Sequence, residues 1–193
     1  MNVPNRLTVS RFILTVAFLI AVFSRYDTLA LFLFGAASLT DYFDGKIARR
    51  DHLITNFGIL MDPLADKILV CSAFIAFVEQ GWIAAWMVVI IVARELAITG
   101  LRLLAASKSV VLAAEGYGKH KTISQIVAIL AILVLASFKS WGAFGETIFG
   151  FSLFGHAWVE EFAILAKWVA VVLTLTSGMI YLWRNRHLYL NDL

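Results

Sequence analysis

The sequence predicts an all-α membrane protein, with six transmembrane helices in one bundle that forms a single domain over residues 1–193. Hydrophobic residues make up 61% of the chain and charged residues 15%, and the mean hydropathy is +0.86. About a quarter of the residues in a typical soluble domain are charged, so a soluble fold of this composition has too few polar side chains to cover its surface. Six segments are apolar and long enough to cross a bilayer core, which takes about 20 helical residues.

Each of these segments is expected to be helical, because backbone groups in hydrocarbon have to pair within their own segment. Pro4 precedes the first segment and Pro63 lies in the first turns of the third, where a helix tolerates proline. No small-residue cleavage pattern follows the first segment, so we interpret it as a retained span and not as a signal peptide. The predicted spans are 7–24, 29–48, 60–79, 82–106, 123–141 and 162–183.

The connections between the spans differ in charge and length. If the amino terminus is cytoplasmic, all but three of the 16 lysines and arginines fall on the inner side, the exceptions being Arg25, Lys139 and Lys167. Basic residues are enriched in cytoplasmic connections, so the sequence predicts that both termini are cytoplasmic. The glycines and aromatic residues of 144–161 indicate an outer loop, part of which lies at the headgroups. Cys71 is the single cysteine, which excludes a disulfide framework and a cysteine metal site.

Four aspartates lie where the second span ends and the third begins. Asp41 and Asp44 are three residues apart and Asp62 and Asp66 are four apart, so each pair projects from one face of its helix. The short connection predicts antiparallel neighbouring helices, with the four carboxylates converging near the cytoplasmic surface. An ionised carboxylate near hydrocarbon costs roughly a few kcal/mol, and four together repel one another unless a cation joins them.

A divalent cation is the partner that this arrangement favours. Hard divalent ions take oxygen ligands, and Mg²⁺ combines a few carboxylates with substrate phosphates. Two such ions about 4 Å apart clamp a pyrophosphate. Gly45 and Gly58, which have no side chain, let a ligand or a second helix approach the backbone closely. The alternative is that the aspartates are loop charges paired with the basic residues beside them, namely Lys46, Arg49, Arg50 and Lys67.

The residues from Asp41 onward read D-x-x-D-G-x-x-A-R and, after eight residues, G-x-x-x-D-x-x-x-D. In this pattern the chain resembles the CDP-alcohol phosphotransferase family, whose signature it fills at every fixed position. The resemblance implies a catalytic motif at 41–66 and two Mg²⁺ or Mn²⁺ ions held by Asp41, Asp44, Asp62 and Asp66. It also implies that Asp66 is the general base. The residues that it implies at the site of the CDP-activated lipid are Asn5, Thr8, Gly45, Arg49 and Thr55.

Further segments extend this resemblance over about the first two thirds of the chain: 4–11, 62–67, 94–102 and 118–122. They resemble the branch of the family that transfers a phosphatidyl group from CDP-diacylglycerol to glycerol 3-phosphate and releases CMP. The resemblance implies an enzyme of phospholipid biosynthesis that is integral to the bacterial cell membrane, with its active site facing the cytoplasm. It also implies a homodimer, whereas no nucleic-acid partner is expected. The last third of the chain carries no motif.

The acceptor of this branch, glycerol 3-phosphate, is a dianion and needs cationic ligands. Four residues on the inner side are predicted to form its phosphate pocket, because arginine binds phosphate in a bidentate manner and lysine acts as a point charge. Alternatively, these residues only contribute to the excess of basic residues on the cytoplasmic side or bind lipid headgroups. For Arg94 a further alternative is pairing with Glu95 or Glu115. The predicted pocket residues are Arg94, Arg102, Lys119 and Lys121.

Two other functions remain open from the sequence. One is another member of the same family whose acceptor is inositol phosphate, serine or phosphatidylglycerol. The other is a small cation transporter that uses the carboxylates as an ion pathway. A transporter is expected to place acidic residues near the membrane midplane and to show repeats, whereas the aspartates here cluster at one end of two spans. Metal-dependent release of CMP separates the two classes.

Overall fold

The computed structural model describes residues 3–50, 56–108, 110, 112, 117–153 and 155–190. Within these ranges each of the six predicted spans is a long helix, and the predicted boundaries lie within a few residues of the observed ones. The largest difference is at the fifth helix, which begins six residues before the predicted 123. The long helices are α1 Val3–Phe23, α2 Asp27–Arg50, α3 Asn56–Glu79, α4 Ala85–Ser107, α5 Tyr117–Ser137 and α7 Trp158–Arg184.

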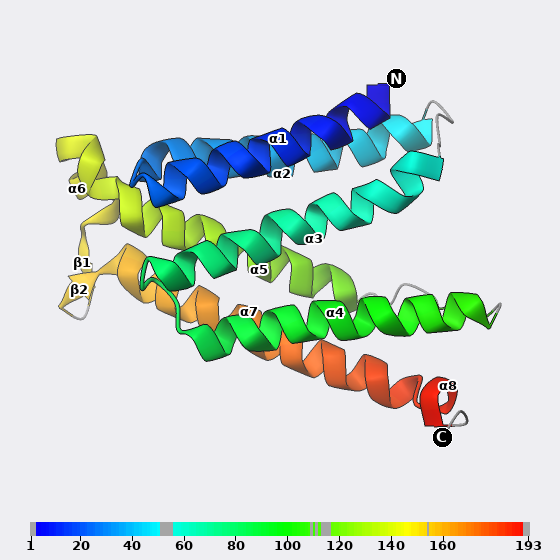
Figure 1. The fold of residues 1–193 in the computed structure, drawn as a ribbon. Helices are drawn as coiled ribbons and strands as arrows, with labels where there is room; N and C mark the ends of the chain where they lie inside the picture. The colour runs from blue at the N-terminus through cyan, green and yellow to red at the C-terminus, as the bar shows by residue number, and fades with distance from the viewer. Residues whose placement is uncertain are drawn as a thin grey trace.

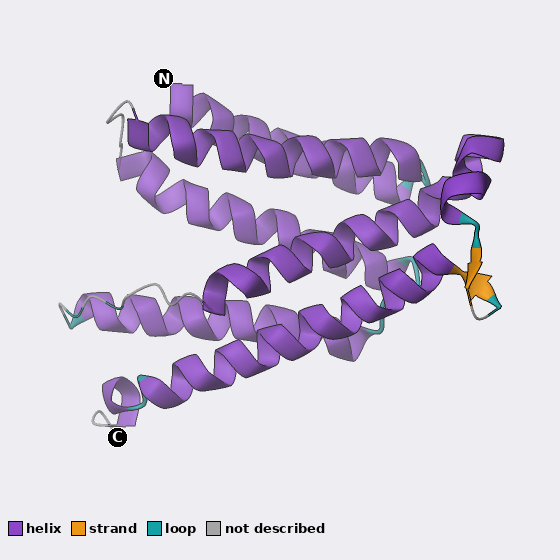
Figure 2. Ribbon diagram, turned by 180° about the vertical axis from the view of Figure 1, so that it is seen from behind, coloured by secondary structure: helices purple, strands orange, loops and turns teal. Residues whose placement is uncertain are grey.

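The predicted outer loop 144–161 contains regular structure. Helix α5 continues through a 3₁₀ turn, η1 Phe138–Trp141, into helix α6 Gly142–Phe149. Strands β1 Ser152–Leu153 and β2 His156–Ala157 then form an antiparallel hairpin, and α7 begins directly after it (Figure 2). Aromatic packing accounts for the regular structure of this segment, since the centre of the Phe149 ring lies 5.5 Å from that of Trp141 and 5.8 Å from that of Trp158. The fold is therefore all-α apart from this hairpin and includes a short last helix, α8 His187–Leu190.

The long helices lie side by side and run in alternating directions (Figure 1). Helix α1 packs against α2 and α3, α5 packs against α2 and α7, and α4 packs against α3 and α7. We call one end of the bundle the motif end, because α2 ends there and α3 begins there. Both chain termini and the end of α4 lie at the motif end, and the hairpin and α6 mark the opposite, hairpin end (Figure 1).

The apolar core is densest in the half of the bundle near the hairpin end. Phe18, Phe34, Phe74 and Phe77 are fully buried there. Their rings are in contact across three helices, with centroids 5.6 Å apart for Phe18 and Phe34 and 6.5 Å apart for Phe18 and Phe77. Buried polar side chains follow the opposite distribution. Among the side chains that the structure describes, all but Ser137 lie at mid-bundle or toward the motif end: Thr8, Arg11, Thr15, Glu95, Lys121, Gln125, Thr174 and Ser177.

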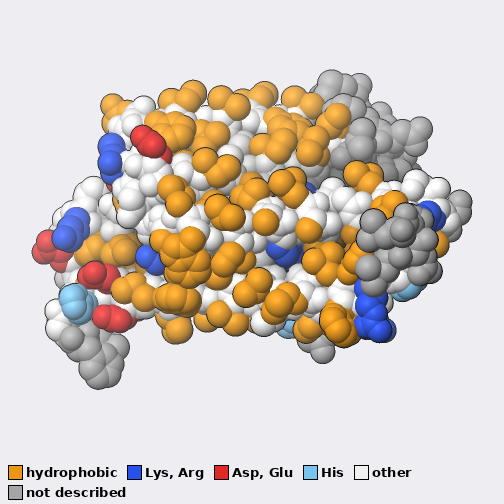
Figure 3. All heavy atoms as spheres, turned by 60° about the horizontal axis from the view of Figure 1, so that its bottom comes forward, with side chains coloured by type: hydrophobic (Ala, Val, Ile, Leu, Met, Phe, Trp, Pro, Cys, Tyr) orange, Lys and Arg blue, Asp and Glu red, His pale blue; other side chains and the backbone are white. Residues whose placement is uncertain are grey.

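The outer surface of the bundle is apolar. Large hydrophobic side chains cover the face shown in Figure 3, and side chains such as Ile20, Phe32 and Leu96 are more than 60% exposed. Within the described ranges, the stretches His120–Phe149 and Trp158–Arg184 are long and apolar enough to cross a membrane. Helix α4 has 23 residues and is also largely apolar, but it carries three charged residues, Arg94, Glu95 and Arg102. A surface of this kind suits lipid and not water, so the chain is a membrane protein.

Candidate active site

The four aspartates of the motif lie at the motif end of the bundle. Asp41 and Asp44 are in the last three turns of α2, and Asp62 and Asp66 are in the first three turns of α3. Both helices pack against α1. Thr55 lies outside the described residues. For seven other predicted residues the description extends to the backbone alone, and each of them lies in a helix: Asn5, Asp41, Asp44, Gly45, Arg49, Asp62 and Lys119.

Asp66 is half-buried, and its charge acts on groups of two helices. It is one of the charges that influence Lys121 of α5, and it also influences Cys71, which lies further along α3. The next residue, Lys67, donates a hydrogen bond to the hydroxyl of Thr99 on α4. The predicted general base therefore lies where α3, α4 and α5 meet.

Helix α1 contributes buried polar side chains at the same end. Thr8, which is predicted to lie at the site of the CDP-activated lipid, is fully buried, and Arg11 is 1% exposed. The Thr15 hydroxyl donates to the backbone carbonyl oxygen of Arg11 at 2.8 Å. In the sequence, Arg11 counts among the basic residues of the inner side and ends the segment 4–11 that extends the family resemblance, but no role in the site is predicted for it. The signal that distinguishes it is its position one turn after Thr8 inside an apolar span, where a charge is costly and usually functional.

Glu95 of α4 connects two of the residues predicted to bind the phosphate of the acceptor substrate. One of its oxygens, Oε1, accepts hydrogen bonds from Nη1 of Arg94, at 3.2 Å, and from Nζ of Lys121. Glu95 and Lys121 are 7% and 5% exposed, so the ion pair is buried between α4 and α5. The backbone oxygen of Glu95 accepts from the Thr99 hydroxyl at 2.7 Å. Because the same hydroxyl accepts from Lys67, the contacts run without a break from α3 through α4 to α5.

Arg94 is confined on its other side by α7. Gly178 faces its side chain so closely that a Cβ at position 178 would lie 2.7 Å from Cγ of Arg94. The glycine is required for this close approach of the two helices. Pairing of Arg94 with Glu95 was the alternative to phosphate binding that the sequence left open. The same contact places the guanidinium next to the ammonium group of Lys121, which also pairs with Glu95.

Arg102 lies two turns further along α4 and faces α7 instead of α5. Its Nε makes a long contact of 3.5 Å to the Tyr181 hydroxyl, and its guanidinium lies 5.8 Å from the centre of the Tyr181 ring. The side chain is exposed. The structure therefore brings Arg94 and Lys121 together at Glu95 and places Arg102 separately, on the α7 side of the motif end.

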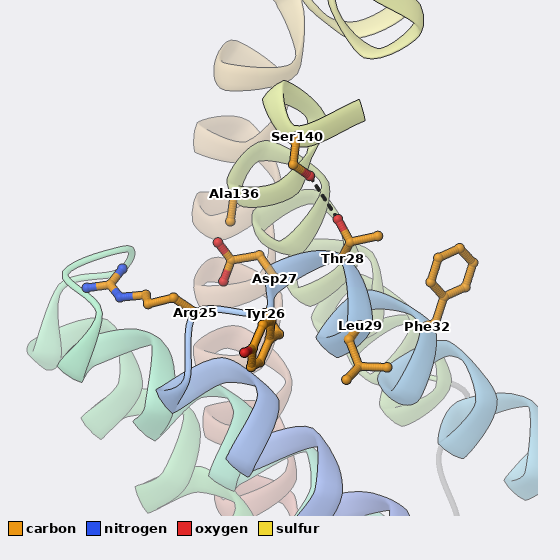
Figure 4. Close-up of a pocket in the computed structure, with 8 residues that line it drawn as sticks. All are labelled: Arg25, Tyr26, Asp27, Thr28, Leu29, Phe32, Ala136 and Ser140. Carbon is orange, nitrogen blue, oxygen red and sulfur yellow. Dashed lines mark hydrogen bonds between the residues drawn. The ribbon is translucent and has the colours of Figure 1, made fainter. Parts of the chain in front are cut away.

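A cavity of about 480 Å³ lies at the hairpin end, far from the aspartates of the motif. Figure 4 shows Asp27 directed toward Ala136 and the Thr28 hydroxyl within hydrogen-bonding distance of Ser140, at 3.0 Å. The indole Nε1 of Trp141 also donates to the Thr28 hydroxyl, at 2.9 Å. These contacts join the start of α2 to the end of α5 and η1. The lining of this cavity includes none of the predicted site residues.

The chemistry of the motif end fits a bound divalent cation. The candidate ligands are four carboxylates, two near the end of α2 and two near the start of α3, and carboxylate oxygen is the ligand type that Mg²⁺ and Mn²⁺ take. Cations on α3, α4 and α5 lie between this end and the middle of the bundle. Such an arrangement can hold a metal-bound pyrophosphate next to a second anionic group.

Comparisons with known proteins agree with this chemistry. The protein of Bacillus subtilis strain 168 named CDP-diacylglycerol–glycerol-3-phosphate 3-phosphatidyltransferase is 38% identical over 205 residues, which cover 95% of each chain. Proteins of the same name from Rickettsia bellii and Rickettsia prowazekii are 35% and 34% identical over 184 residues, which cover 93% of each chain. The family model of the CDP-alcohol phosphatidyltransferases matches residues 1–176. The chain therefore belongs to the CDP-alcohol phosphatidyltransferase family.

Proposed function

We propose that this protein transfers the phosphatidyl group of CDP-diacylglycerol to sn-glycerol 3-phosphate, giving phosphatidylglycerophosphate and CMP in phospholipid biosynthesis. The observation that carries the proposal is the similarity over 95% of the chain to a relative with this named activity, combined with an aspartate motif that is filled at every fixed position. The reaction joins a lipid to a water-soluble alcohol. The reaction therefore suits a site at the end of membrane-spanning helices, which is where the aspartate motif lies.

Asp41, Asp44 and Asp62, together with Asp66, are proposed to hold two divalent cations, Mg²⁺ or Mn²⁺. When bound, these ions neutralise the charge of the donor pyrophosphate and polarise the phosphorus that carries diacylglycerol. The donor head group is proposed to lie against residues of α1, α2 and the connection that follows α2: Asn5, Thr8, Gly45, Arg49 and Thr55. The complete burial of Thr8 supports a place for α1 in this site.

Asp66 is proposed to act as the general base. It takes the proton from a hydroxyl of glycerol 3-phosphate, and that oxygen forms a bond to the phosphorus carrying diacylglycerol while the bond from that phosphorus to CMP breaks. The half-buried position of Asp66 among α3, α4 and α5 supports this role, since the acceptor cations lie on the same side.

The phosphate of the acceptor is proposed to bind Arg94, Arg102, Lys119 and Lys121. Two of these cations, Arg94 and Lys121, share the single carboxylate of Glu95. The three groups together carry one excess positive charge, which attracts an anion bound beside them. This shared carboxylate is the observation that supports a phosphate pocket on the inner side of α4 and α5.

The whole chain is proposed to form one domain that crosses the bacterial plasma membrane six times. Both termini and the active site face the cytoplasm in this proposal. The shared location of both termini and the motif at one end of the bundle supports it (Figure 1), as does the concentration of basic residues on that side. The homodimer is proposed on the family resemblance.

The test is an assay of CMP release by the purified protein in detergent with CDP-diacylglycerol and a panel of acceptors. Glycerol 3-phosphate is expected to be the best acceptor, ahead of inositol phosphate, serine and phosphatidylglycerol. Chelation of divalent cations is expected to abolish CMP release, and Mg²⁺ or Mn²⁺ to restore it. A preference for another acceptor would change the substrate but retain the family chemistry. Cation transport without CMP release would reject the proposal.

A further inference from the structure

Glu95 is the centre of a polar cluster, which we define as Lys67, Arg94, Glu95, Thr99 and Lys121. Glu95 and Lys121 are buried, and the other three are half-buried. The members of the cluster come from α3, α4 and α5. Arg94 and Lys121 donate to the Glu95 carboxylate, and Lys67 donates to the Thr99 hydroxyl, which in turn donates to the backbone oxygen of Glu95. Glu95 is the acidic member of this cluster, and it lies at mid-length in α4. A charge buried within a membrane helix is costly and is usually retained for function.

The cluster leaves positive charge and hydrogen-bonding capacity unused. Arg94 and Lys121 both donate to one oxygen of Glu95, so one negative charge serves two cations. The Nε of Arg94 is buried and has no hydrogen-bond partner among the described residues. Buried donors are nearly always paired in native proteins, so an unpaired guanidinium donor beside an excess positive charge indicates that an anion completes the site.

The cluster also lies next to the predicted general base. Lys67 follows Asp66 directly in the chain, and the charge of Asp66 acts on Lys121. An anion held by Arg94 and Lys121 is therefore close to the carboxylate that takes the proton of the acceptor. This position suits the phosphate of a phosphorylated alcohol whose hydroxyl group has to reach Asp66.

We propose that Glu95 is a positioning residue of the acceptor site, whose carboxylate holds the cationic groups of Arg94 and Lys121 together so that they bind the acceptor phosphate. This inference rests on the proposed function, since it concerns the same acceptor. Glu95 acts through the two cations and does not contact the dianion, which its own charge repels. Without the carboxylate, two like charges in a medium of low dielectric constant repel each other, and a lysine buried without a counterion favours its neutral form.

The first test is Glu95→Gln, which retains the shape of the side chain and removes its charge. The KM for glycerol 3-phosphate is expected to rise by about tenfold or more, since charge-assisted hydrogen bonds to phosphate are lost. The KM for CDP-diacylglycerol is expected to change by less than about twofold, because that substrate is held by the aspartates and the donor-site residues. An unchanged or lowered KM for glycerol 3-phosphate overturns the inference, as does an equal rise in both KM values.

The charge exchange Glu95→Lys with Lys121→Glu separates positioning from simple ion pairing. A purely structural ion pair tolerates this exchange, because the pair persists between α4 and α5. The proposed site does not tolerate it, because the exchange moves the cation from α5 to α4 and places it beside Arg94. We expect the KM for glycerol 3-phosphate to stay at least about tenfold above that of the wild type, and a wild-type KM in the exchanged protein overturns the inference.

Thr174→Val is the matched control. Gln125 lies one turn after Lys121 on α5, and its amide donates to the Thr174 hydroxyl at 3.0 Å in a contact that is as buried as the ion pair. Loss of this contact is expected to lower the unfolding temperature and leave both KM values unchanged.

Glu95→Asp replaces Glu95→Gln if the latter is too unstable to assay. It withdraws the carboxylate by one methylene and is expected to raise the KM for glycerol 3-phosphate by about threefold, because the same charge-assisted bonds are weakened to a smaller extent. Unchanged KM values in Glu95→Asp then overturn the inference. Wild-type CMP release with glycerol 3-phosphate, measured in parallel, shows whether the proposed function itself holds.

Discussion

The two halves of the bundle are held together by different interactions. In the half near the hairpin end, fully buried aromatic rings of α1, α2 and α3 pack against one another, as those of Phe18, Phe34 and Phe77 do. At mid-bundle and toward the motif end, α3, α4 and α5 are joined through the Glu95 carboxylate and the hydrogen bond between Lys67 and Thr99. The same helices thus change from apolar to charged contacts along their length.

This difference indicates where the protein sacrifices stability for function. Helix association in a bilayer depends on close packing and interhelical hydrogen bonds, because lipid is as apolar as the helices themselves. The aromatic half satisfies this requirement mainly through close packing of apolar rings. Buried ion pairs often contribute little net stability, because desolvation offsets the attraction. The charged half therefore fits the role in the reaction that we propose for its residues. Substitutions in the two halves are therefore expected to have different effects.

The largest effect is expected for Asp66→Asn, which retains the size of the side chain and removes its basicity. The chemical step is expected to slow by about a hundredfold or more, as loss of a general base does. Turnover at saturating concentrations of both substrates measures it. Asp27→Asn is the control, because Asp27 is an aspartate of the hairpin end in the first turn of α2 and is expected to be neutral for turnover. Near-normal turnover of Asp66→Asn would assign the base to another residue.

Next in size is Phe77→Ala in the aromatic half. Phe77 is fully buried and contacts the rings of Phe18, Phe74 and Trp82. We expect the free energy of unfolding to fall by about 2 kcal/mol, less than the loss of about 3–5 kcal/mol in soluble cores, because lipid also solvates the exposed surface. Unfolding in detergent measures this change, and the folded fraction should retain both KM values. The exposed Phe32 provides the control Phe32→Ala, and an equal loss there would contradict a packed aromatic core.

Arg102→Ala tests the part of the acceptor pocket that faces α7. The KM for glycerol 3-phosphate is expected to rise about tenfold, since a charge-assisted bond contributes about 1.5–3 kcal/mol. The KM for CDP-diacylglycerol should change much less. Tyr181→Phe, which removes only the hydroxyl near Arg102, is the control and is expected to have a small effect. Loss of affinity for the donor alone would assign Arg102 to the lipid, and equal turnover with glycerol and glycerol 3-phosphate would exclude a phosphate pocket.

The smallest effect is expected for Thr28→Val at the hairpin end. The Thr28 hydroxyl contacts Ser140 and accepts from the indole of Trp141. Interhelical hydrogen bonds in membranes contribute about 0.6 kcal/mol each on average. The unfolding temperature in detergent should therefore fall slightly, and CMP release should be unchanged. Reduced CMP release would show that the hairpin end influences the reaction.

The sequence alone was sufficient for the helices and for the location of the aspartate motif. Apolar length identified all six long helices, because the bilayer requires helical spans. It could not identify the secondary structure within 144–161, because that order depends on ring contacts such as those of Phe149 and Trp158. A tertiary contact of this kind leaves no periodic signal in the sequence.

Side-chain pairing at the site was less accessible from the sequence. Arg94 and Lys121 were identified as cations, but their common partner Glu95 depends on how α4 and α5 face each other. The complete burial of Arg11 likewise depends on the packing of α1 against α2 and α3. Spacing along one helix indicates which residues share a face, and it carries no information about which neighbouring helix that face meets.

Gly178 gives the last third of the chain, which carries no motif, an influence on the position of Arg94, a residue that we propose for the acceptor site. Any larger residue there would force Arg94 to turn away or α7 to move outward, because a Cβ would already lie 2.7 Å from the arginine side chain. The reach of a cation on α4 is thus determined by the bulk of a residue on α7. With Arg94 in the proposed acceptor site, a single steric change on a helix outside the motif is therefore expected to alter the choice of substrate while the four aspartates stay unchanged.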